Sequence, residues 1–349
     1  MHPLVIETVR RAKRFRQRAR ILGRPHTICL MYHRIAMPDA DPWDLSVSPR
    51  HFDEHLTVLR KLADCRSFGD LISARDRSDR PRRMAAITFD DGYRDNLAAA
   101  APLLEAHDVP ATVFVATGMT GAQREFWWDA LTRAFLATPS LPEVLELDTE
   151  NGRHIWHLGG AATCTPEEMR GLARARLPFD LDLHPRVRLL ADVREVLFST
   201  SKDEADHLAE VVLHWSGLDR GGVHGDRPMT ENEVGRLAAS GLVEIGAHTV
   251  THRPLDRVSQ TETHVELSRS RAVLRDIVGK NVATFAYPYG RFGPQTPRLV
   301  AEAGFSAACT TQEFLDIGAG GDPFLFPRIT VRDCDGDAFS RMLRDFVGP

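Results

Sequence analysis

The chain has 349 residues, of which 43% are hydrophobic and 26% charged, and its formal net charge of −4 is close to neutral. A chain of this length can bury a large core, and the balanced charge gives no support for a nucleic-acid binder that acts through bulk charge. The five cysteines are scattered, odd in number and never form a CxxC pair, so we expect free thiols in a reducing compartment and no disulfide framework.

The first 25 residues, 1–25, predict a basic N-terminal helix. Residues 1–24 contain eight lysine or arginine residues and a single acidic residue, Glu7. Such a helix can contact an anionic membrane surface or a phosphate-bearing substrate, or it can be a solvated helix that covers one end of the domain. Its thin apolar face favours the second interpretation. The chain has neither the run of roughly 18–20 apolar residues that a membrane-spanning helix needs nor an apolar secretory segment. We therefore expect a cytoplasmic protein, at most peripherally attached to a membrane.

From Thr27 onward, short apolar runs alternate with amphipathic stretches. In chain order, we expect strand Thr27–Tyr32, helix Phe52–Leu62, strand Met84–Phe89, helix Leu97–Ala106 and strand Ala111–Ala116. After a long interruption, we expect helix Glu231–Ser240, strand Leu242–Ala247, helix Thr263–Ile277, strand Val282–Ala286, helix Thr296–Ala303, strand Phe305–Thr310, strand Phe324–Val331 and helix Asp337–Phe346. This alternation predicts βαβ units around a parallel sheet, in one α/β domain spanning residues 26–349.

The interruption, residues 118–228, is predicted to be a mixed α/β insertion that caps or borders the active face. It opens with an aromatic cluster around Trp127 and Trp128, which can form a sugar-stacking wall or belong to the core. Segments on either side of Asn151-Gly152 predict a hairpin. Helical stretches follow at Pro166–Arg176 and Ser201–Trp215.

Two adjacent carboxylates, Asp90 and Asp91, directly follow a predicted strand. Adjacent carboxylates repel each other, and burying them is costly unless a cation compensates. His248 and His252 follow another predicted strand, and a carboxylate with two histidines suits a hydrolytic metal centre. Taken alone, the aspartate pair is also compatible with an ordinary turn, and the histidine spacing with a chance surface pair.

Two further polar motifs, His33 and the segment ending in Tyr289, also stand at the C-terminal ends of predicted strands. In a parallel sheet these ends lie on one side, where barrels and doubly wound sheets place their chemistry. The convergence of all four motifs favours a closed or nearly closed barrel. The turn around Tyr289 can point a backbone N–H at a developing oxyanion, or it can be a rigid aromatic turn.

Together these segments resemble the polysaccharide deacetylase family (carbohydrate esterase family 4). Thr88-Phe89-Asp90-Asp91-Gly92 matches its first motif residue for residue, His248-Thr249-Val250-Thr251-His252 matches its second, and Pro288-Tyr289 matches the end of its third. Weaker similarity runs from about Cys29 to Val331. The resemblance implies a distorted (β/α) barrel, here with the long mixed α/β insertion. It also implies a divalent metal ion, usually zinc, and removal of an acetyl group, usually N-linked, from a sugar.

Carried over by position, the resemblance implies that Asp91, His248 and His252 bind the metal and that Asp90 is the general base. It implies that the backbone N–H of Tyr289, together with the metal, stabilises the tetrahedral oxyanion. Thr249 would orient the histidine loop through its hydroxyl.

The chain departs from the family pattern at two places. Where the family often has an arginine that braces the catalytic aspartate, this chain has Ala286; Arg328 is the candidate replacement, with a surface or core-edge salt bridge as the alternative. After Arg328 the chain contains no histidine, so the usual general acid has no counterpart. His33 is our leading substitute, since a protonated imidazole there could donate to the leaving amine. Otherwise His33 lines the substrate cleft or is structural.

We therefore expect a metal-dependent hydrolase that removes an N-acetyl group from an amino sugar, glycoside or polysaccharide precursor, with no nucleic-acid partner. Deformylation or O-deacetylation of a sugar-bearing metabolite is a close alternative. The missing late histidine also leaves open a non-catalytic, metal-retaining carbohydrate-binding protein, although such a protein has no need of the spare carboxylate of Asp90.

Overall fold

The computed structural model describes residues 26–74, 77, 79, 81, 83–121, 124–219, 227–312 and 321–347. The basic helix predicted for residues 1–25 lies outside these ranges. No helix within the described ranges is long and apolar enough to cross a membrane. The five cysteines are all free thiols, as the sequence predicts, and three of them are buried.

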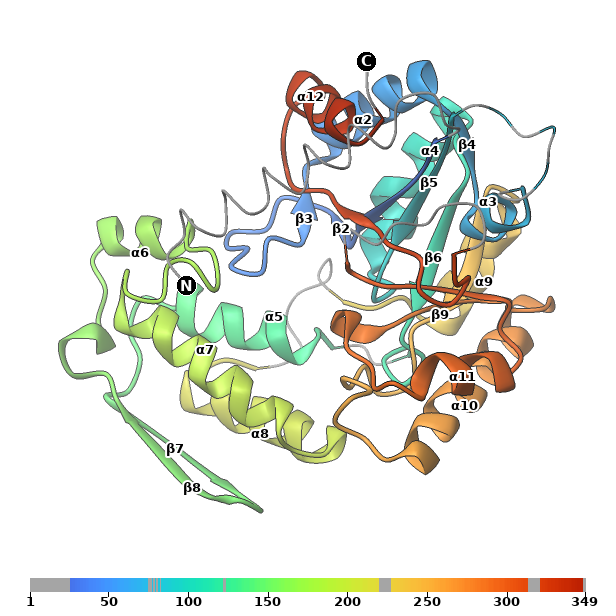
Figure 1. Cartoon of the computed structure of the whole chain (residues 1–349). Coiled ribbons are helices and arrows are strands. Elements are labelled where there is room, and N and C mark those ends of the chain that lie inside the picture. Colours follow the sequence, from blue (N-terminus) through green and yellow to red (C-terminus); the bar gives the residue numbers. More distant parts are fainter. Residues whose placement is uncertain are drawn as a thin grey trace.

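The centre of the fold is a curled parallel sheet (Figure 1). Its strands run in the order β11 (Ala307–Cys309), β10 (Thr284–Ala286), β9 (Val243–Ala247), β6 (Ala111–Val115), β5 (Arg83–Phe89), β1 (His26–Tyr32) and β12 (Ile329–Thr330). The short β4 (Asp64–Arg66) pairs with the first half of β5, whose second half pairs with β6. An isolated parallel bridge joins Cys309 to Phe326, just upstream of β12, so the two edges of the sheet approach each other. This is the distorted (β/α) barrel that the sequence predicts.

Helices follow the strands in the expected alternation. They are α2 (Pro49–Leu62), α3 (Phe68–Ala74), α4 (Ala101–His107) with a preceding π-helical turn η1 (Asn96–Ala100), α9 (Glu231–Ala239), α10 (Gln260–Val278), α11 (Thr296–Glu302) and α12 (Gly336–Val347). Helix α9 begins with a capping box between Thr230 and Glu233, and α10 ends at Gly279 in the left-handed conformation. These local signals explain why the observed helix boundaries lie close to those predicted from the sequence.

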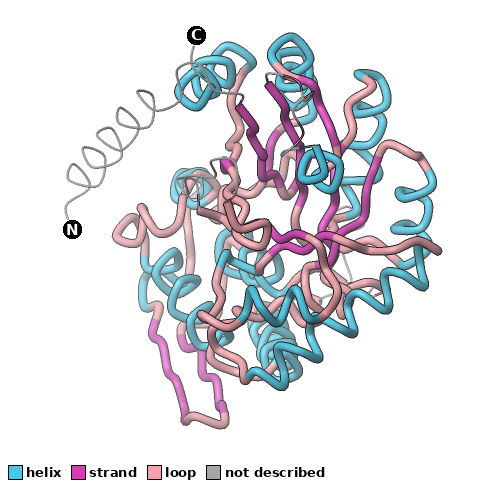
Figure 2. The backbone as a smooth tube through the Cα atoms, turned by 45° about the vertical axis from the view of Figure 1, so that its right-hand side comes forward, coloured by secondary structure: helices cyan, strands magenta, loops and turns pink. Residues whose placement is uncertain are grey.

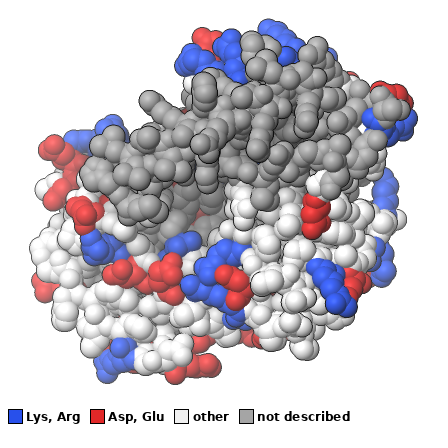
Figure 3. Space-filling view, viewed as in Figure 1, with Lys and Arg blue, Asp and Glu red and all other residues white. Residues whose placement is uncertain are grey.

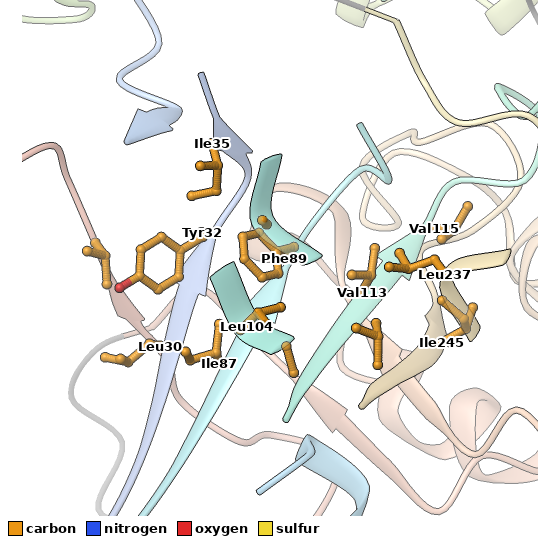
Figure 4. Close-up of a cluster of buried hydrophobic side chains, with 14 of the residues drawn as sticks. Leu30, Tyr32, Ile35, Ile87, Phe89, Leu104, Val113, Val115, Leu237 and Ile245 are labelled. Carbon is orange, nitrogen blue, oxygen red and sulfur yellow. The ribbon is translucent and has the colours of Figure 1, made fainter. Parts of the chain in front are cut away.

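Alternate residues of each strand face opposite sides of the sheet, which separates two cores. Leu30, Ile87, Val113 and Ile245 belong to the outer core, where the helices pack against the sheet (Figure 4). Three of their sequence neighbours, Cys29, Ala86 and Phe114, belong to a smaller interior cluster that also includes Cys309 of β11. Because the sheet is curled, this second cluster fills the barrel, and the same alternation directs the polar residues that follow the strands into the barrel mouth.

The insertion packs as a helical layer beside the barrel, with its own apolar core. Its elements are α5 (Trp127–Thr132), a π-helical turn η2 (Arg133–Ala137), the hairpin β7 (Val144–Thr149) and β8 (Gly152–His157), a 3₁₀ turn η3 (Gly159–Ala162), α6 (Pro166–Leu172), α7 (Pro185–Phe198) and α8 (Lys202–Trp215). The fully buried Arg186 of α7 donates to backbone carbonyls, among them Ala161 at 2.8 Å and Ala162 at 2.6 Å. The predicted hairpin is present and projects away from the rest of the molecule (Figures 1 and 2).

Some parts of the fold differ from the prediction. Only Ile329–Thr330 of the expected strand Phe324–Val331 pairs with β1, because proline has no N–H to donate and Pro327 interrupts the ladder. Helix α3 was not predicted, since it is short and contains Gly69. Its Phe68 is fully buried in the interior cluster, so α3 fills the barrel from the end opposite to the polar motifs.

A pair of two-residue strands, β2 (Arg34–Ile35) and β3 (Ser46–Val47), follows β1 and was also not predicted. These strands hold the loop between them beside the barrel mouth. Asp41 accepts hydrogen bonds from the backbone of Leu45 at 3.1 Å and Ser46 at 2.8 Å, which closes the loop.

Candidate metal centre and active site

The two aspartates lie in the tight turn after β5, and both are buried. Asp91 has a φ of 72°, a left-handed conformation that residues other than glycine adopt uncommonly. Thr249, His252 and Tyr289 share this conformation, with φ values of 66°, 58° and 57°. Four of the six non-glycine residues with positive φ in the described ranges therefore lie at this site. Strain of this kind concentrates at functional sites, where the surrounding structure holds it in place.

Asp91, His248 and His252 form a compact buried group. Nε2 of His252 lies 3.0 Å from Oδ1 of Asp91 and 3.2 Å from Nε2 of His248. Nε2 of His248 lies 3.5 Å from the same carboxylate oxygen. Within the described residues, this is the only group of three potential ligand side chains whose donor atoms converge in this way. The spacing therefore brings together the three residues that the sequence predicts as metal ligands.

Hydrogen bonds behind the two imidazole rings keep their Nε2 atoms directed at Asp91. Nδ1 of His248 donates to the carbonyl oxygen of Ala286 at 2.8 Å, which leaves Nε2 with a free lone pair. Nδ1 of His252 lies 2.9 Å from the hydroxyl of Tyr289. Lone pairs held this close repel one another unless a cation lies among them. The donor set therefore fits a divalent metal ion.

The loop that carries both histidines is anchored by Glu266 of α10. Its carboxylate accepts hydrogen bonds from the backbone N–H of Val250 at 2.7 Å and of Thr251 at 2.9 Å, and from the Thr251 hydroxyl at 2.6 Å. The hydroxyl of Thr249 accepts from the backbone N–H of His252 at 3.0 Å, which agrees with the orienting role predicted for Thr249. Sequence reasoning missed Glu266, because nothing in a charged amphipathic helix distinguishes one glutamate from its neighbours.

Arg328 forms a buried, two-pronged ion pair with Asp90. Its two terminal nitrogens donate to the two carboxylate oxygens at 2.7 Å and 2.6 Å. Arg328 also donates to the hydroxyl of Thr88 at 3.1 Å and to the carbonyl of Thr310 at 3.0 Å. Arg328 is 1% exposed and Asp90 is 2% exposed, so the alternative of a core-edge salt bridge is wrong. The planar guanidinium fixes the orientation of the Asp90 carboxylate.

The surrounding charges keep both carboxylates ionised. Burial alone would raise the pKa of Asp90, but the charge and hydrogen bonds of Arg328, together with the nearby His248 and His33, outweigh it, and the pKa lies below its ordinary value. Burial opposes the ionisation of Asp91 too, but His252 and His248 lower the pKa of this carboxyl well below its usual range. A carboxylate that stays ionised at neutral pH can accept a proton or bind a cation.

His33 and Tyr289 line the same cavity as the candidate metal ligands Asp91, His248 and His252, which are called the metal group below. The backbone carbonyl of His33 accepts a hydrogen bond from the side-chain amide of Asn96 at 2.9 Å, which fixes the chain at the end of β1. The side chain of Tyr289 points back to His252, while its left-handed backbone turns at the barrel mouth. Both residues therefore lie where the sequence places them.

The cavity at the barrel mouth has a volume of about 690 Å³. Asp90, Asp91 and the two histidines lie on one side, and α5, α7 and the segment before α7 lie on the other. Trp127 and Trp128 line this cavity, yet they are only 8% and 5% exposed, so they also belong to the core of the insertion. The contribution of α7 was not foreseen, because neither this helix nor its position over the site is apparent in the sequence.

Comparison with known proteins agrees with this geometry. The family model described as polysaccharide deacetylase matches residues 77–171 and 192–308, more than half of the chain. Among solved structures, the chain is similar to the deacetylase PplD from Streptococcus pyogenes, in complex with acetate (18% identity, 93% of this chain and 98% of that chain, TM-score 0.56). It is also similar to IcaB from Ammonifex degensii (16% identity, 92% and 97% coverage, TM-score 0.55). A polysaccharide deacetylase from Bacillus cereus aligns with 15% identity, 90% and 68% coverage and a TM-score of 0.54. No curated protein sequence matches the chain.

The fold and the site together define a carbohydrate deacetylase. With the family match over more than half of its length, the chain belongs to the polysaccharide deacetylase family. The non-catalytic carbohydrate-binding protein considered from the sequence is thereby set aside.

Proposed function

We propose that the protein hydrolyses the N-acetyl group of an amino sugar, in a metal-dependent reaction in which Asp90 is the general base. The observation that carries this proposal is the convergence of Asp91, His248 and His252 beside an Asp90 carboxylate held by Arg328. A site that only bound a metal would have no use for the second, separately braced carboxylate.

Asp91, His248 and His252 would hold the cation, and zinc is the expected ion, because two imidazoles and one carboxylate suit it. Bound there, a zinc ion would acidify a coordinated water and polarise the acetyl carbonyl. Asp90 would accept the proton from the attacking water. Its carboxylate oxygens each have a lone pair beyond those that Arg328 occupies, so the brace orients the base without blocking it.

Tyr289 and His33 complete the proposed mechanism. The backbone N–H of Tyr289 would donate to the oxyanion of the tetrahedral intermediate, and the left-handed turn at this residue supports such an exposed donor. His33, which lines the same cavity, would donate a proton to the leaving amine. The acetyl group is thereby released as acetate, and the sugar is left with a free amino group.

The test is acetate release from N-acetylated sugars by the purified protein, before and after chelation and after zinc is restored. Asp90→Asn should abolish turnover and keep its zinc, measured by elemental analysis, whereas His248→Ala should lose its zinc. Equal activity of Asp90→Asn and wild type would refute the role of Asp90. Release of formate would show that the enzyme removes a formyl group, and release of acetate from O-acetylated sugars alone would show that it cleaves an ester. Either result would contradict the proposed N-deacetylation.

For the general acid, the pH dependence of kcat in His33→Ala is compared with that of wild type. A changed profile is expected if His33 is the proton donor. An unchanged profile would remove His33 from the role.

We also propose that residues 118–228 act as an insertion in a catalytic domain spanning residues 26–349, since α7 of this segment lines the cavity. An absence of nucleic-acid partners is supported by the surface, where acidic and basic side chains are interspersed on the described part of the face in Figure 3. A cytoplasmic location and a peripheral membrane contact through residues 1–25 stay predictions.

A further inference from the structure

The cavity beside the metal group offers more than a pocket for an acetamido group. Its volume of about 690 Å³ lies within the range of roughly 300–1,000 Å³ that holds ligands of drug size. The wall opposite the aspartates therefore contacts the part of the substrate that is attached to the reacting sugar. The chemistry of this wall indicates what that part is.

The wall has an aliphatic part, with Leu45, Leu177, Pro178, Leu181 and Ala191, and a charged part on α7, with Arg188, Asp192, Arg194 and Glu195. The aliphatic side chains carry no hydrogen-bonding atom, so sugar hydroxyls placed against them would lose their water without gaining a partner. An alkyl chain, by contrast, is stabilised by every methylene that it buries there.

The aromatic residues of the cavity are already packed by other side chains. Trp128 stacks on Phe126 with ring centroids 4.4 Å apart and an interplanar angle of 12°. The guanidinium of Arg194 lies 4.1 Å from the ring centroid of Phe198 and 5.1 Å from that of Trp43. Sugar rings bind aromatic residues through an open ring face, and these contacts occupy such faces. The aromatic residues therefore add apolar area to the wall and offer few stacking platforms.

The apolar surface continues from the cavity to the outside. Leu177 and Leu181 line the cavity, and Phe179 and Leu183 of the same segment are 69% and 55% exposed. Large exposed apolar side chains that cluster at the edge of a cavity mark a surface for an apolar ligand. A ligand that leaves the cavity along residues 177–183 would remain on apolar side chains.

We infer that the substrate is an acetylated amino sugar that carries an apolar aglycone, such as an alkyl or lipid chain, with that chain lying along residues 177–183. This inference rests on the proposed function, since it takes the acetylated sugar as given. An interior unit of a polysaccharide fits less well, because it presents hydroxyl groups on both sides of the reacting sugar and would place them against the aliphatic wall.

The test compares the octyl and methyl glycosides of N-acetylglucosamine, below the critical micelle concentration, with an N-acetylglucosamine oligosaccharide. Each buried methylene raises affinity about fourfold, so kcat/KM for the octyl glycoside should exceed that for the methyl glycoside about tenfold or more, chiefly through KM. Equal values, or faster turnover of the oligosaccharide, would overturn the inference.

Calorimetric binding of the same compounds to zinc-loaded Asp90→Asn separates this inference from the proposed reaction. Preferential binding of the octyl glycoside supports the inference, and equal binding overturns it. Preferential binding without acetate release from wild type would overturn the proposed reaction and leave the aglycone site standing.

Three variants locate the chain-binding surface. Leu181→Asn should bring the octyl-to-methyl ratio close to one, and Leu181→Met, which keeps the wall apolar, should preserve it. Val265→Asn is the matched control, because Val265 is 52% exposed on α10 and does not line the cavity. A ratio that falls equally in Leu181→Asn and Val265→Asn would contradict the assignment, and thermal unfolding of each variant verifies that it is folded.

Discussion

Replacing Arg328 by methionine tests the buried ion pair on which the proposed general base depends. Methionine has a similar length and fills most of the same space, but it carries no charge and no donor. The substitution removes two hydrogen bonds to Asp90, at 2.7 Å and 2.6 Å, and leaves a carboxylate that is 2% exposed without its cationic partner. It also removes the hydrogen bonds to Thr88 and Thr310.

Breaking a buried ion pair by removing one partner costs about 3–5 kcal/mol, because an uncompensated charge stays buried. We therefore expect Arg328→Met to lower the free energy of unfolding by about 3–5 kcal/mol. Asp90→Asn leaves the guanidinium of Arg328 without its anion and should also lower the free energy of unfolding. The double variant removes both charges, so it should be more stable than the sum of the two single effects predicts, by about 3 kcal/mol.

The assay is urea unfolding of the metal-free protein, followed by circular dichroism, for wild type, both single variants and the double variant. Metal-free protein is used so that differences in metal binding do not enter the free energy of unfolding. Arg298→Met is the control: its ion pair with Glu302 spans 2.7 Å, but the two side chains are 77% and 48% exposed. Exposed pairs of this kind contribute about 0–1 kcal/mol.

Additive effects of the two substitutions on the free energy of unfolding would refute the proposed coupling between Asp90 and Arg328. If the two single effects add to the double effect within about 0.5 kcal/mol, Asp90 and Arg328 are not energetically coupled. A loss for Arg328→Met no larger than that for Arg298→Met would lead to the same conclusion. Arg328→Lys adds a second check, since lysine keeps the charge but cannot pair with both oxygens, and it should recover only part of the stability and of kcat.

Three further predictions concern other parts of the chain. Glu266→Gln should weaken zinc binding about 10–100-fold, because the histidine loop loses a carboxylate that accepts three hydrogen bonds; unchanged zinc affinity in a metal titration would contradict this. Gly290→Ala should destabilise the protein more than Gly279→Ala: both glycines have φ near 65°, but an added Cβ at Gly290 would lie 2.0 Å from the Thr311 hydroxyl, and at Gly279 it would meet nothing within 4 Å. Chemical denaturation of the two variants compares them, and equal losses would show that only the backbone conformation matters. Burial lowers the pKa of His55 from 6.5 to about 4, so its neutral form contributes stability above pH 6.5 that is lost as the pH falls toward 4, up to about 3 kcal/mol. The stability difference between wild type and His55→Gln should therefore shrink over this range, and parallel pH curves would count against it.

Local signals were sufficient to predict most of the barrel from the sequence. Apolar runs of strand length, alternating with capped amphipathic helices, gave β1, β5, β6 and β9 within a residue or so of their observed bounds. These elements are predictable because their signals depend on neighbouring residues in the chain. The strand expected at Phe324–Val331 is only partly formed, because Pro327 interrupts it: Phe326 pairs with Cys309 and only Ile329–Thr330 pairs with β1.

The candidate metal ligands could be predicted for the same reason. Asp91 and His248 lie within two residues of the ends of β5 and β9, His252 lies on the same loop as His248, and strands of a parallel sheet end on the same side. Once the strands are identified, the side chains that follow them must lie near one another. The separate roles of Asp90 and Asp91 were assigned from the resemblance of this motif to that of the polysaccharide deacetylase family.

The tertiary structure decided everything that depends on segments distant in the chain. Arg328 meets Asp90 across 238 positions in the sequence, and whether it braced the carboxylate or formed a surface pair was open until their burial was known. The wall of the cavity is a second case, since no pattern places α7 and residues 177–181 opposite the metal group. Sequence alone determined which chemistry the barrel mouth can support, because that chemistry sits on local motifs. The brace for its base and the surface presented to the substrate arise from packing between distant segments, where local patterns carry no information.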